Sequence, residues 1–261
     1  MNPLTHVQKS YQRLRRMAGY TLIALPLAII LLAFFKYQEI QPTLSHYYFF
    51  EEHPGLIRTM FTGFLILVGG VMIAYRGFDN RDNWIHNLAG FFALCVAAFP
   101  KLHDAADRYY TTGLLSGLHG PSAALLFCLA AYAVWYCGGN SFKSRLNSSE
   151  LRILEVSKWT SLGTMLSGIG IYIAFLVFGK IFSLPNVGII TVELLGFFGF
   201  ASHWLVMTRV ISTANTRKAT SRVTHQDHSA LLQGDVHTRI VPTIPGLQVP
   251  AVTPPEEDFI L

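Results

Sequence analysis

Charged residues are scarce in this 261-residue chain. Asp, Glu, Lys and Arg together make up 13% of it, whereas soluble domains contain roughly 25%. Residues 18–35 contain no charged side chain, and residues 187–207 contain one acid and one histidine. Such stretches cannot form a water-facing surface. The scarcity of charge therefore argues against a soluble enzyme and against a nucleic-acid-binding protein.

Cysteine is also scarce. The chain has 3 Cys, and all of them (Cys95, Cys128 and Cys137) lie within apolar stretches. An odd number of cysteines without CxxC spacing argues against a disulfide framework and against a zinc ribbon.

Long hydrophobic runs, by contrast, are abundant, and hydrophobic residues make up 51% of the chain. A transmembrane helix needs about 20 mostly apolar residues to cross about 30 Å of hydrocarbon. Six segments meet or nearly meet this requirement: 18–35, 59–75, 85–99, 117–137, 159–178 and 187–207. We therefore predict an all-α, multi-pass membrane protein with a six-helix bundle at residues 18–210.

Two terminal segments flank the predicted bundle. Residues 1–17 are basic, and residues 211–261 contain five prolines and few large apolar groups. A segment of the second kind cannot bury much of a core, so we expect a disordered tail. Its last eight residues, 254–261, are a candidate recognition or secretion signal, through which a protein partner would bind.

The distribution of Lys and Arg predicts the orientation. If the amino terminus is cytoplasmic, fifteen of the 20 Lys and Arg residues lie on the cytoplasmic side. Cytoplasmic loops carry an excess of these residues. We therefore expect both termini in the cytoplasm and predict a bacterial inner-membrane location. This bias also accounts for the net charge of +5, so no nucleic-acid partner is expected.

One acid, Glu193, lies well inside a predicted span. An ionisable residue costs about 2.5–3.5 kcal/mol on insertion scales, which makes it a functional candidate. The predicted topology brings it near His119, at the outer end of the fourth span. We predict that these two side chains anchor an outer-face pocket; the structural alternative is a hydrogen bond that fixes the bundle.

Other polar side chains fall on the same predicted face, in the first two outer loops. Ser45 and His46 lie in the first, and His103 and Asp104 in the second. The predicted ligand-binding set is His119, Glu193, Ser45, His103 and Asp104. If the protein is an enzyme, the candidate catalytic residues are Ser45, His46, His119 and Glu193. Polar side chains in the outer loops are also expected of any surface that faces water.

No cofactor is expected, although zinc remains an alternative. Histidine and carboxylate groups are the ligands that zinc takes, and the candidate ligands are His46, His103 and His119. A haem would need facing histidines, for which His86 and His203 are the only plausible inner pair. Asp82 or Asn83 is predicted to cap the third helix.

Short motifs resemble a known group of proteins. They are Pro-Thr-Leu-Ser at 42–45, Asn-Leu-Ala-Gly at 87–90, Phe-Pro at 99–100, His-Gly-Pro-Ser-Ala at 119–123, and the pair Glu193 and Trp204. Over about four-fifths of the chain these resemble a bacterial family of six-span membrane proteins of unknown function, itself similar to the DRAM/Frag-type proteins of eukaryotes. The resemblance implies a six-helix bundle without a settled enzymatic role.

A second resemblance is to the ceramidase and progestin-receptor-like membrane hydrolases. It implies that Ser45, His46 and His119 belong to a zinc site that cleaves lipid amide or ester bonds. That pattern expects His-x-x-x-His in the last span, where this chain has only His203, and it usually has seven spans.

Several functions remain open at this point. The leading hypothesis is a non-enzymatic protein that binds a lipid, a small ligand or a partner through the outer-face pocket. The alternatives are the zinc-dependent hydrolase, a transporter in which Glu193 titrates, and a bacterial effector inserted into a host membrane.

Overall fold

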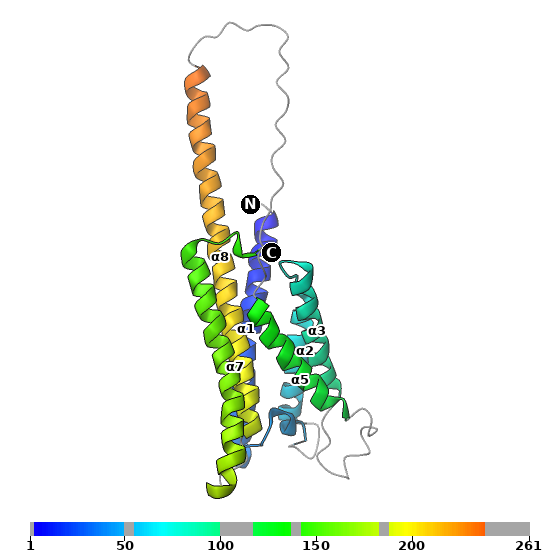
Figure 1. Ribbon diagram of the computed structural model, residues 1–261. Coiled ribbons are helices and arrows are strands. Elements are labelled where there is room, and N and C mark those ends of the chain that lie inside the picture. The colour runs from blue at the N-terminus through cyan, green and yellow to red at the C-terminus, as the bar shows by residue number, and fades with distance from the viewer. Residues whose placement is uncertain (1–2, 50–54, 100–116, 137–141, 183–187, 238–261) are drawn as a thin grey trace. The chain divides into compact units, whose positions relative to one another are not determined.

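The computed structural model describes residues 3–49, 55–99, 117–136, 142–182 and 188–237 (Figure 1). Over these ranges the chain is helical and contains no strand, which confirms the predicted all-α class. The helices are α1 (Pro3–Tyr37), α2 (Leu56–Ala74), α3 (Asn80–Ala98), α5 (His119–Tyr136), α7 (Ser148–Phe182) and α8 (Gly188–His237). A short 3-10 helix, η1 (Leu44–Tyr48), lies between α1 and α2.

Four of these helices are long and apolar enough to cross a membrane. The qualifying segments are Lys9–Tyr37, Leu56–Ala74, Ser148–Phe178 and Gly188–Lys218. The remaining two predicted spans, 85–99 and 117–137, fall in α3 and α5, which are not among them. In α3 the first turns carry Asp82 and His86, so only the later part of the helix is continuously apolar.

The terminal segments differ from the prediction. α1 begins at Pro3, so the basic segment is the first part of a long helix rather than a separate region. α8 continues to His237, and the prediction of a disordered tail from residue 211 is therefore wrong up to that point. One reason is that residues 211–237 contain no proline, the residue that most strongly disfavours a helix. The proline-rich part, including 254–261, lies outside the described residues.

The chain divides into two compact units, Met1–Arg209 and Val210–Ile260. The first contains α1 to α7 and the first part of α8, together with every predicted site residue. The second contains the remainder of α8. The sites and contacts of the following sections lie in the first unit.

Side-chain caps define two helix starts. Asp79 has an extended backbone and its carboxylate accepts a hydrogen bond from the backbone N–H of Asp82, so Asp79 caps α3. The prediction of Asp82 or Asn83 was wrong because the helix begins three residues earlier. At α7 the Asn147 side chain accepts from the N–H of Glu150 at 2.8 Å, and the Glu150 carboxylate accepts from the N–H of Asn147 at 2.9 Å. This reciprocal pair is a capping box.

Close backbone contact joins α2 and α3. A Cβ atom added at Gly69 would lie 2.8 Å from the carbonyl oxygen of Gly90, and one added at Gly90 would lie 2.6 Å from that of Gly69. In lipid, such small residues let helices pack closely. α8 meets α7 in the same way, because a Cβ at Gly199 would lie 2.7 Å from the Ser161 carbonyl oxygen.

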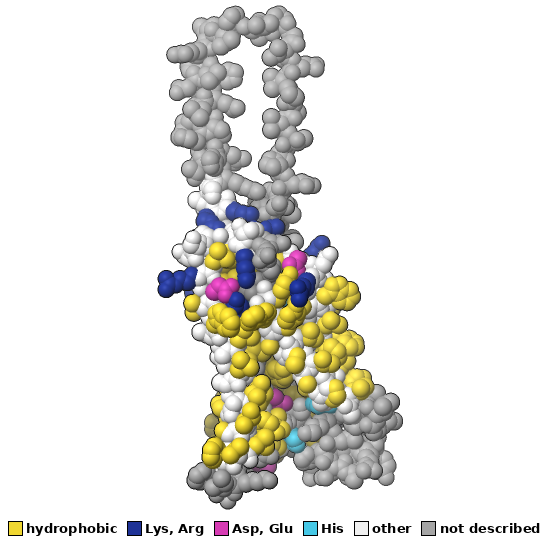
Figure 2. All heavy atoms as spheres, viewed as in Figure 1, with side chains coloured by type: hydrophobic (Ala, Val, Ile, Leu, Met, Phe, Trp, Pro, Cys, Tyr) yellow, Lys and Arg dark blue, Asp and Glu magenta, His cyan; other side chains and the backbone are white. Residues whose placement is uncertain are grey.

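Contacts between distant segments define two ends of the unit. At one end the Tyr136 hydroxyl donates to Asp79, and the N–H of Arg76 donates to the Tyr11 hydroxyl. At the other, η1 meets the start of α8. Figure 2 shows hydrophobic side chains covering a broad band of the visible face, with Lys and Arg gathered at one end and His toward the other. We refer to these as the basic end and the histidine end.

Candidate functional site

The site at the histidine end is built on η1. Gln38 has a φ of 57° and ends α1 with a left-handed residue. Thr43 then caps η1, with its hydroxyl accepting from the N–H of His46 at 3.2 Å. Tyr47 is fully buried, and its hydroxyl accepts from the N–H of Gln41. These contacts fold the connection inward and bury Ser45.

Ser45 lies against His119, the first residue of α5. The distance from Ser45 Oγ to His119 Nε2 is 2.8 Å, and His119 Nδ1 lies 2.7 Å from the carbonyl oxygen of Phe99. A carbonyl oxygen only accepts, so Nδ1 carries a proton and, in the neutral ring, Nε2 accepts from the serine hydroxyl. Both side chains are buried, with Ser45 7% and His119 3% exposed. The histidine is thus held in one tautomer, facing a serine.

Glu193 holds η1 from the other side. Its Oε2 accepts from the backbone N–H of Leu44 at 2.6 Å. Close by, the N–H of Ile190, in the first turn of α8, donates to the Pro42 carbonyl oxygen at 2.9 Å. First-turn N–H groups have no partner within their own helix, so the loop supplies one here. The half-buried Glu193 carboxylate therefore holds the backbone of Leu44, the residue next to Ser45, in place.

The structure brings together three of the predicted site residues, Ser45, His119 and Glu193, which lie on η1, α5 and α8. Glu193 reaches the group through the N–H of Leu44, the residue next to Ser45. His46 lies in η1 but bonds locally, with its Nδ1 2.6 Å from the Thr43 hydroxyl. His103 and Asp104 lie outside the described residues. Within the described ranges, no three His, Cys, Asp or Glu side chains form a group able to hold a metal.

A second polar cluster, at the basic end, surrounds Arg15. This side chain is 2% exposed, and its Cζ lies 4.6 Å and 4.7 Å from the ring centroids of Tyr75 and Trp204. Arg15 Nε donates to the Thr208 hydroxyl at 3.2 Å, and the Trp204 indole N–H donates to the Arg15 carbonyl oxygen at 2.9 Å. Sequence reasoning counted Arg15 only as one of the charges that set orientation. The missed signal is its spacing, since Arg15 lies four residues after Tyr11 and seven before Leu22 on one helical face.

Asp82 and His86 complete the basic end. His86 Nδ1 lies 2.9 Å from the Asp82 carbonyl oxygen and 3.3 Å from its carboxylate. The Asp82 carboxylate also accepts from the Tyr75 hydroxyl and from the N–H of Phe78. His203 instead faces Ser157, with its Nδ1 3.2 Å from the serine hydroxyl. Each of the two histidines considered as a haem pair therefore has its own protein partner.

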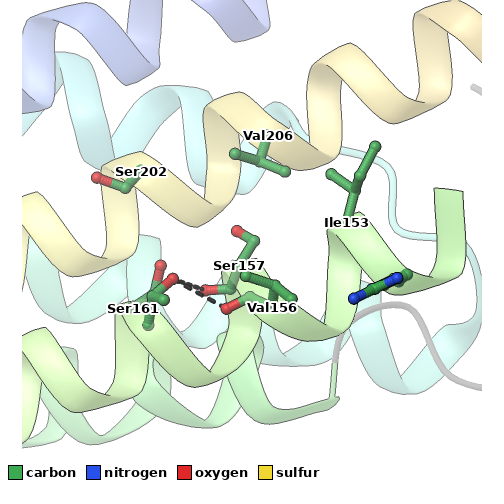
Figure 3. Close-up of a pocket in the computed structure, with 8 residues that line it drawn as sticks. Ile153, Val156, Ser157, Ser161, Ser202 and Val206 are labelled. Carbon is green, nitrogen blue, oxygen red and sulfur yellow. Dashed lines mark hydrogen bonds between the residues drawn. The ribbon is translucent and has the colours of Figure 1, made fainter. Parts of the chain in front are cut away.

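A groove lies between α7 and α8, away from the Ser45 site (Figure 3). It has a volume of about 430 Å³. Its walls come from both helices, and their side chains are Arg152, Ile153, Val156, Ser157, Thr160, Ser161, Ser202 and Val206. Sequence reasoning did not predict this groove.

No family model, curated protein or solved structure matches the chain. The function must therefore be argued from the site itself.

Proposed function

We propose that this protein is a six-span membrane protein with its basic end in the cytoplasm. Four apolar helices support the membrane location. The pairings of α2 with α3 and of α3 with α5 support counting α3 and α5 as the other two spans, because both pack within the same bundle. The basic end carries the excess of Lys and Arg that marks a cytoplasmic face.

We further propose that the Ser45–His119–Glu193 site binds a lipid head group or small molecule carrying hydroxyl or amino groups. The supporting observation is the convergence of three polar side chains from η1, α5 and α8 at one end of the bundle. The site offers a carboxylate and a histidine with a fixed tautomer. A carboxylate accepts charge-assisted hydrogen bonds, which favours a ligand that donates N–H or O–H groups.

Substitution of Glu193 tests this proposal in purified protein. We expect Glu193→Leu to lower thermal stability in detergent, because it removes the acceptor of the Leu44 N–H and such a loss costs about 1–3 kcal/mol. Glu193→Gln keeps an acceptor and should be closer to the parent in stability. The probe is phosphatidylethanolamine, whose ammonium group donates, compared with phosphatidylcholine of the same chains, whose head group has no N–H.

Phosphatidylethanolamine should stabilise the parent more than phosphatidylcholine does, and both Glu193 variants should lose the difference. Glu155→Gln, an acid near the basic end that pairs with Lys143, is the control and should keep it. If Glu193→Leu is as stable as the parent and shows the same lipid difference, Glu193 anchors neither the fold nor a ligand.

A second candidate function is hydrolysis of an ester by a serine–histidine pair. The observation that favours it is the chain of two hydrogen bonds from Ser45 Oγ through the His119 ring to the Phe99 carbonyl oxygen. A nucleophile bonded to a base that a third group orients is the arrangement of serine hydrolases. Here a backbone carbonyl would be the orienting group.

In such a reaction Ser45 Oγ attacks the ester carbonyl carbon while its proton passes to His119 Nε2. The imidazolium then gives that proton to the departing alcohol, which leaves an acyl-serine. Water, deprotonated by His119, hydrolyses the acyl-serine and releases the acid. A zinc-dependent version, with His46, His103 and His119 as the candidate ligands, is weaker, since His46 is bonded to Thr43.

A fluorophosphonate probe, which forms a covalent bond with an activated serine, distinguishes the two candidates. Labelling should occur at Ser45 and be lost in Ser45→Ala and His119→Ala. It should persist in Ser122→Ala, which removes another buried serine of the same region. An unlabelled parent protein would contradict the hydrolase and leave the binding proposal standing.

A further inference from the structure

The groove between α7 and α8 has a cation at one end, and its other lining side chains are three aliphatic ones and four that carry a hydroxyl group. Ile153 and Val156 on α7 face Val206 on α8 (Figure 3). The Thr160 hydroxyl donates to backbone carbonyl oxygens of its own helix, those of Val156 and Ser157. The Thr160 hydroxyl therefore already has hydrogen-bond acceptors within α7, and the methyl group of the side chain is left to contact a neighbour. The three aliphatic side chains and this methyl group suit a hydrocarbon chain.

The dimensions of the groove match one leaflet. Its lining on α7 runs from Arg152 to Ser161, which at about 1.5 Å per residue is about 14 Å. The hydrocarbon core is about 30 Å thick, so this is about half of it. The lining starts at the basic end, near the capped start of α7. The groove therefore starts at the basic end, and its last residues on α7, Thr160 and Ser161, lie within the predicted span 159–178.

The charge at the mouth of the groove is positive. Arg152 is exposed there. The two acids of α7 are already bonded, because Glu150 accepts from the N–H of Asn147 and Glu155 pairs with both Lys143 and Lys158. Arg209 follows Ser202 by seven residues and Val206 by three, so it lies on the groove-facing side of α8. Basic side chains between transmembrane helices on the cytoplasmic side bind anionic lipid head groups.

We infer that this groove is a binding site for an anionic glycerophospholipid of the leaflet at the basic end. One acyl chain lies between Val156 and Val206, and the phosphate lies at Arg152. Arginine is suited to this role because its planar guanidinium binds phosphate with two parallel hydrogen bonds. This site is separate from the Ser45 site and takes a ligand of opposite charge preference.

Native mass spectrometry of the full chain, with phosphatidylglycerol and phosphatidylcholine of identical acyl chains, tests the inference. The parent should retain phosphatidylglycerol at least several-fold better. Arg152→Gln should lose that preference. Arg13→Gln removes the same charge from an exposed position on α1 and should keep it, which separates a local site from general attraction to the basic end.

A second pair of variants tests the acyl-chain part of the site. Thr160 lines the groove, whereas Thr164, one turn further along α7, does not. Thr160 is exposed and Thr164 half-buried, and both donate to a carbonyl oxygen of their own helix. Thr160→Phe should reduce retention of phosphatidylglycerol, and Thr164→Phe should not. Equal retention by the two Phe variants, or an unchanged preference in Arg152→Gln, would overturn the inference.

Discussion

The crossing of α2 and α3 allows a sharp test, because two adjacent glycines have opposite surroundings. A Cβ at Gly69 would lie 2.8 Å from the Gly90 carbonyl oxygen and 3.0 Å from Leu94 Cγ, whereas a Cβ at Gly70 would meet nothing within 4 Å. Backbone cannot move aside as a flexible side chain does. We therefore expect Gly69→Ala to push the two helices apart, and Gly70→Ala to leave their packing unchanged.

The magnitude follows from the difference between the two variants. Both exchange Gly for Ala inside a helix, so the gain in helix propensity of about 1 kcal/mol is common to them and cancels. What remains is the cost of overpacking, typically about 1–3 kcal/mol. Thermal unfolding in detergent, followed by circular dichroism, should thus place Gly69→Ala below Gly70→Ala by roughly 2–4 °C for each kcal/mol.

Two outcomes for these variants would contradict the packing of α2 against α3 through Gly69. Equal midpoints for the two variants would mean that α2 and α3 do not approach through Gly69. A higher midpoint for Gly69→Ala than for Gly70→Ala would mean that the added methyl group is accommodated between α2 and α3 and improves their packing.

Two further predictions concern the basic end and a helix start, and both are read from thermal unfolding. Arg15→Ala should destabilise the protein by at least about 2 kcal/mol, because it removes a buried side chain packed against the Tyr75 and Trp204 rings. Arg13→Ala, on the exposed face of the same helix, should stay within about 0.5 kcal/mol of the parent. Asn147→Ala should cost about 1 kcal/mol through loss of the α7 cap, and Asn147→Asp, which keeps an accepting oxygen, should restore most of it; an unchanged Asn147→Ala variant would contradict the capping role.

Sequence alone predicted the helical class and most helix positions, because long apolar runs have few other solutions. It also predicted that Ser45, His119 and Glu193 lie at one end, because the predicted spans alternate in direction and would put every second connection on the same side. The short connection after α1 could not be predicted in detail. Its inward fold depends on burying Tyr47 and on the backbone contacts of Pro42 and Leu44, which have no local sequence signature.

The glycines show a similar limit. Small residues in membrane helices can allow close packing, but a Cβ at Gly63, Gly70, Gly163 or Gly170 would meet nothing within 4 Å. Which face of a helix meets a neighbour depends on its rotation in the bundle. That rotation is set by many weak contacts rather than by any single residue.

The bond between Ser45 and His119 can be measured through a double-mutant cycle of Ser45→Ala and His119→Ala. A buried hydrogen bond of this kind contributes about 0.5–1.5 kcal/mol, so we expect the double variant to be less destabilised than the two single variants added together by about that amount. Additivity within about 0.3–0.5 kcal/mol would show that the two side chains do not interact, and would contradict the site on which both proposed functions rest.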